Sequence, residues 1–171
     1  MSLILGKGGV QKLLVGYPTV SDKYNVGPGV VEGPTSVLPG DLVYVGSAHG
    51  SYVVKADAGV SPVAAGFAIA TNVKVPGTYP APQGPVPFAA GEAFGLFVSG
   101  YLAVELASGA VLADAKEGAK IYIDATSGKL TTVSTSNAQL VGEFTGVTEL
   151  QGTKKVAEIF VPYMEVIPAG E

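Results

Sequence analysis

The stretch Gly118-Ala-Lys-Ile-Tyr-Ile-Asp124, continued by Ala125-Thr-Ser-Gly-Lys-Leu-Thr-Thr132, decides the fold class of this chain. Ile121 and Ile123 fall on one face of an extended strand, because side chains alternate along a strand with a period of two. The Thr-Ser-Gly-Lys sequence at 126–129 is typical of a turn, and a second strand begins after it. The whole stretch therefore predicts a β-hairpin.

The same hairpin pattern occurs earlier in the chain. Gly40-Asp-Leu-Val-Tyr-Val45 matches residues 118–123 in character, and a glycine turn follows each copy. The offset between the copies is 78 residues at the first glycine and 76 at Gly66 and Gly142, which begin the next apolar segment. This repetition predicts a duplicated β unit.

Further short apolar segments extend the pattern. Strands are predicted at 42–45, 52–54, 66–70, 93–98, 101–106, 119–123, 130–134, 142–147 and 156–162. The most apolar stretch, 94–113, contains three glycines and Glu105, so it is read as two buried strands around a Ser99-Gly100 turn and not as a membrane-spanning helix. The predicted fold is all-β, an antiparallel barrel or sandwich of short strands built on the duplicated hairpin unit.

Glycine and proline divide the rest of the chain. Residues 1–39 combine these two residue types with scattered tyrosines and valines, which predicts an extended N-terminal arm that lies on its own domain or on a neighbour. Residues 40–171 are predicted to form the β domain. Within that domain, five prolines at 75–91 predict a stiff surface loop.

The composition favours association with other chains. Charged residues make up 14% of the sequence, against about 25% in an average domain, and the mean hydropathy is +0.40. A surface with so few charges is expected to be covered by a membrane or by other protein. The N-terminus lacks the pattern of a signal peptide, and no membrane partner is expected. A net charge of −4 without any arginine disfavours nucleic acid as a partner.

Reactive groups are scarce in the sequence. The chain has no cysteine, which excludes disulfides and thiolate chemistry, and its aspartates occur singly, so no metal or cofactor site is expected. His49, the one histidine, is expected at the tip of the first hairpin. Ser47 or Ser51 could complete a hydrolase triad with it and with Asp41 or Asp57, but no nucleophile-elbow motif supports this. The chain is therefore predicted not to be an enzyme.

The repeated segments carry a resemblance to a known family. The hairpin at 118–132, the Leu140-Val-Gly142 strand and the closing strand at 156–162 resemble the capsid decoration, or cement, proteins of tailed bacteriophages. The segments at 39–45 and 65–70 are similar to the first half of such proteins, so the likeness covers roughly residues 40–162. The proline-rich loop at 75–91 and the lack of arginine depart from the pattern.

The resemblance implies a structural role and no catalysis. It implies a protein made in the host bacterial cytoplasm that binds the outer surface of the capsid in the virion, with the major capsid protein as partner. There it would clamp neighbouring capsid subunits against the pressure of packaged DNA, as a homotrimer or, failing that, a homodimer. The residues expected at its interfaces are Tyr17, Pro18, Tyr24, Val26, Val30, Val31, Tyr79 and Phe88.

Two other functions stay open from the sequence. A carbohydrate-binding β-sandwich module, of the adhesin or tail-spike type, would need exposed aromatic rings in a groove, expected around Tyr79 and Phe88. A small β-fold hydrolase would need His49 within hydrogen-bond reach of a carboxylate.

Overall fold

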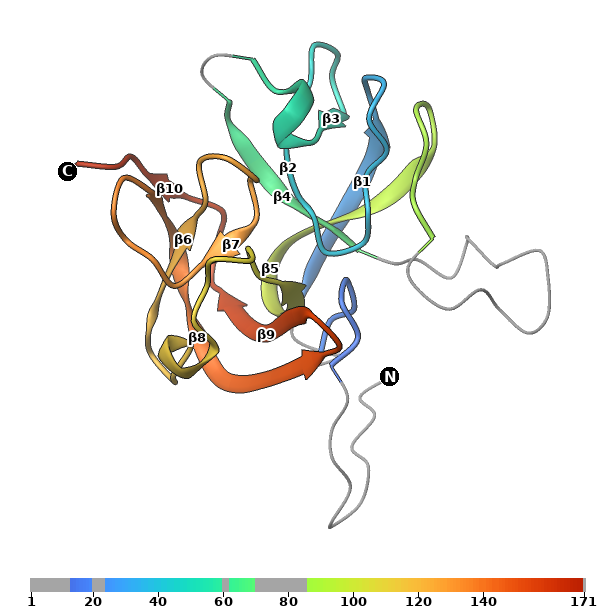
Figure 1. The fold of residues 1–171 in the computed structure, drawn as a ribbon. Helices are drawn as coiled ribbons and strands as arrows, with labels where there is room; N and C mark the ends of the chain where they lie inside the picture. The colour runs from blue at the N-terminus through green and yellow to red at the C-terminus, as the bar shows by residue number, and fades with distance from the viewer. Residues whose placement is uncertain (1–12, 20–23, 60–61, 70–85, 171) are drawn as a thin grey trace, which may run out of the picture.

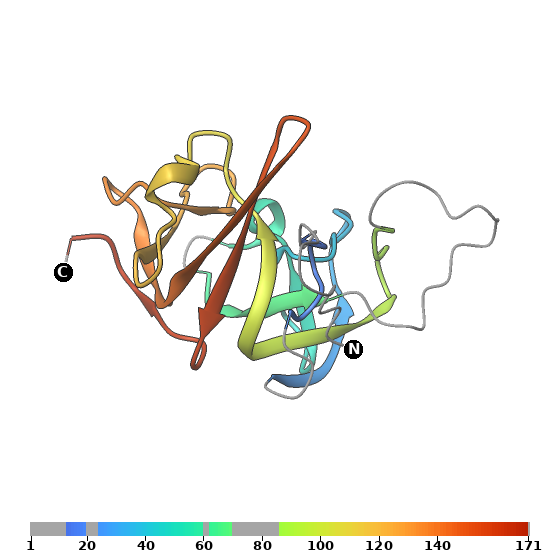
Figure 2. The same ribbon diagram turned by 90° about the horizontal axis from the view of Figure 1, so that it is seen from below.

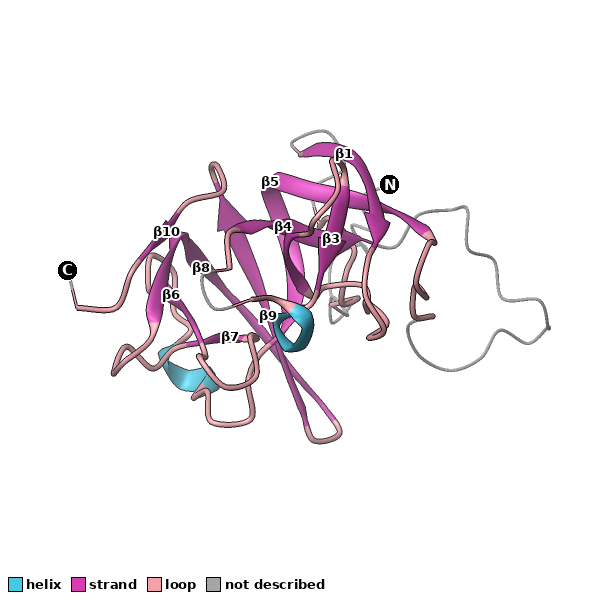
Figure 3. Ribbon diagram, turned by 90° about the horizontal axis from the view of Figure 1, so that it is seen from above, coloured by secondary structure: helices cyan, strands magenta, loops and turns pink. Residues whose placement is uncertain are grey.

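A computed structural model of the chain describes residues 13–19, 24–59, 62–69 and 86–170 (Figure 1). The fold is all-β, as predicted, with only two short 3₁₀ turns in the described part (Figure 3). The strands are β1 (Asn25–Val31), β2 (Leu42–Val45), β3 (Ser51–Val53), β4 (Ala64–Ile69), β5 (Ala93–Glu105), β6 (Lys120–Ile123), β7 (Leu130–Thr131), β8 (Ala138–Gln151), β9 (Lys154–Val161) and β10 (Val166–Ile167). The 3₁₀ turns are η1 (Lys55–Asp57) and η2 (Leu112–Asp114).

The first half of the chain closes into a ring of five strands, which we call unit A. It consists of β1 to β4 and residues 93–99 of β5, and its pairings run β1–β3–β2–β4–β5 and back to β1. All of these pairs are antiparallel except β1–β3, which is parallel. Unit A is therefore a small closed barrel.

The second half repeats this ring as unit B. Residues 100–105 of β5 pair with β9, and the order continues through β8 and β6 to β7. A parallel bridge between Leu106 and Leu130 joins β7 back to the end of β5. β5 is thus shared, and Figure 1 shows it running from one unit into the other. β10 adds to the start of β8.

Backbone hydrogen bonds confirm the duplicated hairpin at the offsets that the sequence predicts. In unit A, Gly40 N donates to Ala68 O at 2.7 Å and Ala68 N donates to Asp41 O at 2.9 Å. In unit B the same two bonds join residues 118 and 119 to Phe144, both at 2.9 Å. The glycines that start the two hairpins have positive φ, +92° at Gly40 and +78° at Gly118, which glycine adopts without steric cost.

The two larger of the three buried clusters among the described residues lie in different parts of the molecule. The interior of unit A holds Val31, Val37, Val43, Ala68, Phe88, Phe94 and Leu96. The larger cluster joins both units, because the outer face of β2, β4 and β5 in unit A packs with residues from the interior of unit B, such as Ile121, Phe144 and Ile159. The two rings thus form one folded body.

The predicted turn at Ser99-Gly100 is wrong, because β5 runs through it without a break. Gly100 has φ +121°, a conformation that glycine tolerates. The strand changes partners there, from β1 and β4 to β9. The apolar residues on both sides of Gly100 therefore belong to one long strand that connects the units.

Part of the segment expected to be an arm lies inside the fold. β1 pairs with β3 and β5 and closes unit A, although it contains Gly27, Pro28 and Gly29. Gly29 is required there, because a Cβ at this position would lie 2.7 Å from the Phe94 ring. Residues 1–12 and most of the loop at 75–91 lie outside the described residues.

Candidate interface surface

An apolar stripe runs along the outer face of β1. Tyr24, just before the strand, is 39% exposed, Val26 is 43% exposed and Val30 is 41% exposed. Val26 and Val30 share a face with the exposed Pro28, because side chains alternate along a strand. Tyr24 lies before a register shift in the strand, and its ring stacks on that of Phe97, the residue that pairs with Val26. Val31 points to the opposite face and is buried. Three of the predicted interface residues are therefore available to a partner, and Val31 serves the core.

The aromatic residue predicted at the edge of the proline-rich loop is also a core residue. Phe88 is 2% exposed, and its ring centroid lies 5.9 Å from that of Phe94 inside unit A. A buried ring cannot act as a platform for a sugar, so Phe88 does not form the exposed groove that a carbohydrate-binding module would need. Tyr79, the other predicted platform residue, lies outside the described residues.

The segment at 13–19 lies along the second half of β5. Gly16 N donates to Ala103 O at 2.9 Å, Thr19 N donates to Tyr101 O at 3.1 Å, and Ala103 N donates to Tyr17 O at 3.3 Å. Pro18 is half-buried in a bridge with Leu102, whereas Tyr17 is 48% exposed. These bonds hold the segment, which turns at residues 14–17, against an edge of unit B.

The start of this segment is anchored by the β8–β9 hairpin, which extends beyond the body of the molecule (Figure 2). Leu13 N donates to Glu149 Oε2 at 2.7 Å, and Gln151 Nε2 donates to Leu13 O at 2.5 Å. The Leu13 side chain packs with Ala103 and Val156. Residues 13–19 of the predicted arm therefore lie on their own domain.

Exposed apolar residues on this hairpin and segment escaped the sequence prediction. Leu150 is 62% exposed and Val147 is 37% exposed on β8, and Leu14 is 44% exposed beside the anchored Leu13. Val147 and Leu150 stand among polar residues and Leu14 stands in an apolar run, and both patterns also describe a strand with a buried face. Only the projection of the hairpin beyond the core distinguishes the two cases.

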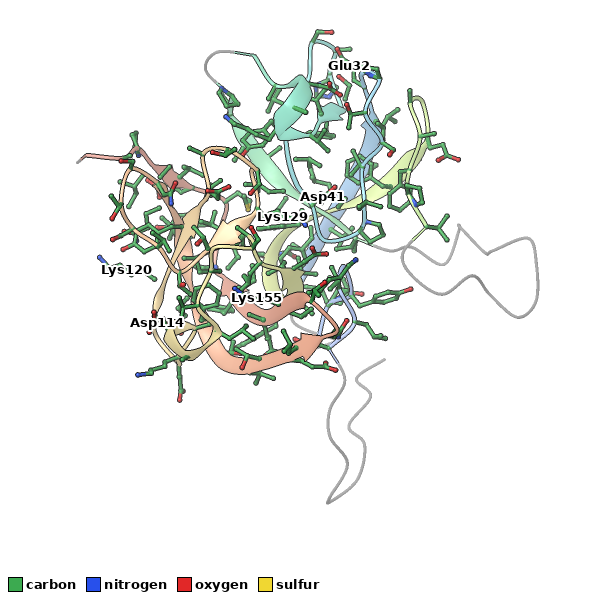
Figure 4. The ribbon with its side chains drawn as sticks, in the orientation of Figure 1. Glu32, Asp41, Asp114, Lys120, Lys129 and Lys155 are labelled. Atoms are coloured by element: carbon green, nitrogen blue, oxygen red, sulfur yellow. The ribbon has the colours of Figure 1, made fainter. Side chains whose placement is uncertain are left out.

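Charged side chains meet where the two units join. Lys129 Nζ lies 2.6 Å from Glu105 Oε1, and Lys154 Nζ lies 3.4 Å from the other oxygen. Burial raises the pKa of Glu105, but the hydrogen bond and charge of Lys129, with a smaller effect of Lys154, outweigh it, so the pKa lies below its ordinary value. Burial raises the pKa of Asp41, which interacts with Lys129 across this junction (Figure 4).

The first hairpin turn is held by a carboxylate and shows no triad. Glu32 Oε2 accepts a bond from Ser47 N at 2.8 Å, and the Ser47 and Ser51 hydroxyls also donate to this carboxylate. These hydroxyl bonds lower the pKa of Glu32 to about 2. Both serines proposed as nucleophiles thus donate to Glu32, while His49 is exposed at the turn. Figure 4 shows Glu32 at the tip of unit A, far from the junction.

The part of the chain that the structure describes contains neither a candidate metal site nor a helix long enough to cross a membrane. No three residues of the types that bind metals come together there. The helical turns of the same residues are too short to cross a bilayer. The prominent surface features of the described chain are thus apolar side chains on strands and on one extended segment.

Comparison with known proteins agrees with the family resemblance. The sequence profile of the family described as "Structural cement protein (E217 gp24/Pam3 gp6)" matches residues 9–161. A chain in a solved structure of the capsid of Myoviridae Phage XM1 has a similar fold, with a TM-score of 0.60 and 16% identity over 91% of this chain and 93% of that chain. No curated protein matches the sequence.

Proposed function

Because the chain belongs to the family of phage structural cement proteins, we propose that it binds the outer surface of a phage head and clamps neighbouring major capsid subunits against the pressure of the packaged DNA. The observation that carries this proposal is the family match over residues 9–161, which spans both units and the extended segment. The role is structural, and the virion is where the protein acts.

The surface of the described chain supports this role. Exposed valines, leucines and tyrosines lie on β1, on the 13–19 segment and on the β8–β9 hairpin, in a chain with few charged residues. Aromatic and aliphatic side chains of this kind form the centres of protein interfaces. We expect the interface to include Tyr17, Tyr24, Val26 and Val30, with Pro18 supporting its neighbour from a half-buried position.

Cosedimentation with capsid shells tests the proposal. Expanded shells assembled without this protein should bind it saturably, and bound shells should resist heat and osmotic shock better than bare ones, because a protein that binds only the assembled state stabilises it. Cryo-electron microscopy should place it on the outer surface between capsid subunits. Shells that take up no protein, or take it up only on the inside, would contradict the proposal.

The oligomeric state is a separate part of the proposal. We expect a homotrimer, with a homodimer as the second possibility, since closed cyclic assemblies are the usual form of such oligomers. Light scattering of the purified protein and the symmetry of its density on the shell measure this directly. A monomer in both settings would remove the oligomer and leave the capsid role intact.

A further inference from the structure

One edge of β1 lacks a neighbouring strand among the described residues. Val30 N donates to Gly50 O at 3.1 Å, on the side of β3, and Val31 N donates to Glu92 O at 3.0 Å, on the side of β5. Backbone groups alternate along a strand, so those of Val26 and Pro28 face the same side as those of Val30. β3 begins only at Ser51, opposite Val30, and so does not reach them.

The internal repeat shows what occupies the matching edge. Val26 pairs with Phe97 in unit A as Tyr101 pairs with Phe160 in unit B, and by the same register Pro28 corresponds to Ala103. In unit B the edge is covered by the 13–19 segment, which turns at residues 14–17 and then forms an antiparallel bridge between Pro18 and Leu102. Tyr101 O accepts a bond from Thr19 N and Ala103 O accepts one from Gly16 N. The same backbone edge thus accepts hydrogen bonds from another segment of the chain in unit B, and is not covered by any described residue in unit A.

We propose that the outer edge of β1 at residues 26–28 binds an extended strand of a capsid-shell protein, through the kind of antiparallel backbone pairing that β5 makes with residues 17–19. The inference rests on the proposed function and names the surface and the kind of partner through which it operates. Strand addition to a free sheet edge is a recurrent mode of peptide recognition, in which backbone hydrogen bonds supply the affinity.

Pro28 defines the chemistry of the bound strand. Ala103 donates its N–H to Tyr17 O in unit B, but proline has no N–H to donate at the matching place. The partner strand must therefore donate N–H groups to the carbonyl oxygens of Val26 and Pro28, and accepts nothing from residue 28. The residues from 25 to 31 carry no charge, so the partner strand places apolar, uncharged side chains over Val26 and Val30.

A second copy of the chain fits this edge less well. The segment at 13–19 of each copy already lies on its own β5 and is anchored to Glu149 and Gln151. Two β1 edges facing each other would each lack the residue-28 donor, whereas a partner strand without proline meets that loss on one side only. The structure therefore favours a different protein as the source of the strand.

Substitutions at Val26 test the edge through binding to capsid shells assembled without this protein. Val26→Pro puts a ring carbon where the edge N–H lies, and Val26→Asp puts a charge on the stripe. Each should weaken binding about tenfold or more, since one backbone hydrogen bond or buried apolar contact is worth roughly that factor. Val63→Asp, at a residue that is 64% exposed in unit A, is the matched control and should bind as the wild type does.

Pro28→Ala completes the series because it restores the donor that Ala103 has in unit B. This variant should bind shells at least as tightly as the wild type. A tenfold loss would mean that the proline side chain itself makes the contact, which would overturn strand addition at this edge.

The other outcomes separate the possible explanations. Binding by both Val26 variants within twofold of the wild type overturns the inference alone, whereas a wild type that does not bind shells overturns the proposed function and the inference with it. A fall in melting temperature well beyond that of Val63→Asp, in both variants, would show that the chain's own residues cover the edge. Self-association in the absence of shells that Val26→Asp abolishes would assign the edge to a second copy. Either result overturns the proposal.

Discussion

The outer faces of the two units have the same backbone and opposite surface chemistry. A row of paired residues crosses the sheet in each unit, and the register of the pairs makes the two rows equivalent. The row in unit A is Val26–Phe97–Phe67–Leu42, and the row in unit B is Tyr101–Phe160–Glu143–Lys120. Phe97, Phe67 and Leu42 are at most 5% exposed, whereas Glu143 and Lys120 are exposed.

This difference shows that the two units share a backbone pattern but not the chemistry of their outer faces. Whether a face packs against the other unit determines whether its residues are apolar or charged. Unit A buries its row in the cluster that it shares with the interior of unit B. Unit B leaves its own row facing outward, with Tyr101 and Phe160 half-buried against each other at a ring distance of 4.7 Å. A charged pair at Lys120 and Glu143 suits a solvated face.

Truncation from the N-terminus should have the largest effect on stability. It removes β1, the strand of unit A that corresponds to the second half of β5 in unit B. Deletion of residues 1–31 removes β1 and opens the ring, so the protein should lose its cooperative unfolding transition. Deletion of residues 1–19 leaves β1 in place but removes the 13–19 segment from β5, and should cost about 3–5 kcal/mol of unfolding free energy for the hydrogen bonds of that segment and the buried Leu13. Urea denaturation followed by circular dichroism measures both.

A folded and stable protein after deletion of residues 1–31 would show that β1 is dispensable. In that case β1 would match the second half of β5 in its backbone pairing but not in its contribution to stability.

Phe97 and Phe160 offer a matched substitution on the equivalent rows. Phe97→Ala should destabilise the protein by about 3–5 kcal/mol, because Phe97 is fully buried and packs edge-on against Phe67 at 6.3 Å. Phe160→Ala should cost about 1 kcal/mol, since it removes a half-exposed ring and one aromatic contact. Equal losses in urea denaturation would contradict the difference in burial between the two faces.

The backbone repeat was more predictable from the sequence than the path of the strands around it. Gly40 and Gly118 mark the hairpins because both need positive φ, which few other residues adopt. β1 was missed because glycine and proline normally weaken a strand. Here the backbone nitrogen of Pro28 lies on the outer edge of β1, where no described residue needs an N–H from it. Gly29 has no side chain and so makes room for the Phe94 ring. These reasons depend on partners far away in the sequence.

The candidate interface was predictable only in part, for a related reason. Tyr24, Val26 and Val30 are exposed as an interface requires, but Val31 and Phe88 carry the same apolar signal and belong to the core of unit A. Composition marks a residue as apolar without saying which face of the sheet it occupies. The alternation along β1 separates the two groups once the strand is known.

Gly66 inside β4 and Gly142 at the matching place in β8 should respond alike to substitution. A Cβ at Gly66 would overlap the carbonyl oxygen of Phe97, and a Cβ at Gly142 would overlap that of Phe160. Gly66→Ala and Gly142→Ala should each destabilise the protein by about 2 kcal/mol, with Gly142 the more sensitive because its φ is +152°.

Gly59→Ala is the control for these two substitutions, because nothing lies within 4 Å of a Cβ there. It should change the unfolding free energy by less than about 0.5 kcal/mol. Tolerance of alanine at only one of the two equivalent glycines, measured by thermal denaturation, would break the equivalence of the two units at this position.

The smallest expected difference concerns the carboxylates that hold the two hairpin turns. Glu32, from the end of β1, clamps the turn of unit A, while Asp124 clamps the turn of unit B through Ser127 N at 2.7 Å and its hydroxyl at 2.5 Å. Hydrogen bonds from serine hydroxyls lower the pKa of both, to about 2 for Glu32.

A carboxylate whose pKa is lower in the folded state contributes stability above its unfolded pKa, and this contribution is lost as the pH falls to the folded value. For Glu32 that window runs from 4.5 down to about 2. Melting temperatures between pH 6 and pH 2 should therefore fall less steeply for Glu32→Gln and for Asp124→Asn than for the wild type, whereas the exposed Glu165→Gln should follow the wild type. Because the two turns are held by carboxylates from different strands, the two effects should add in the double variant. If the melting temperature of the double variant falls between pH 6 and pH 2 as steeply as that of the wild type, neither turn depends on its carboxylate.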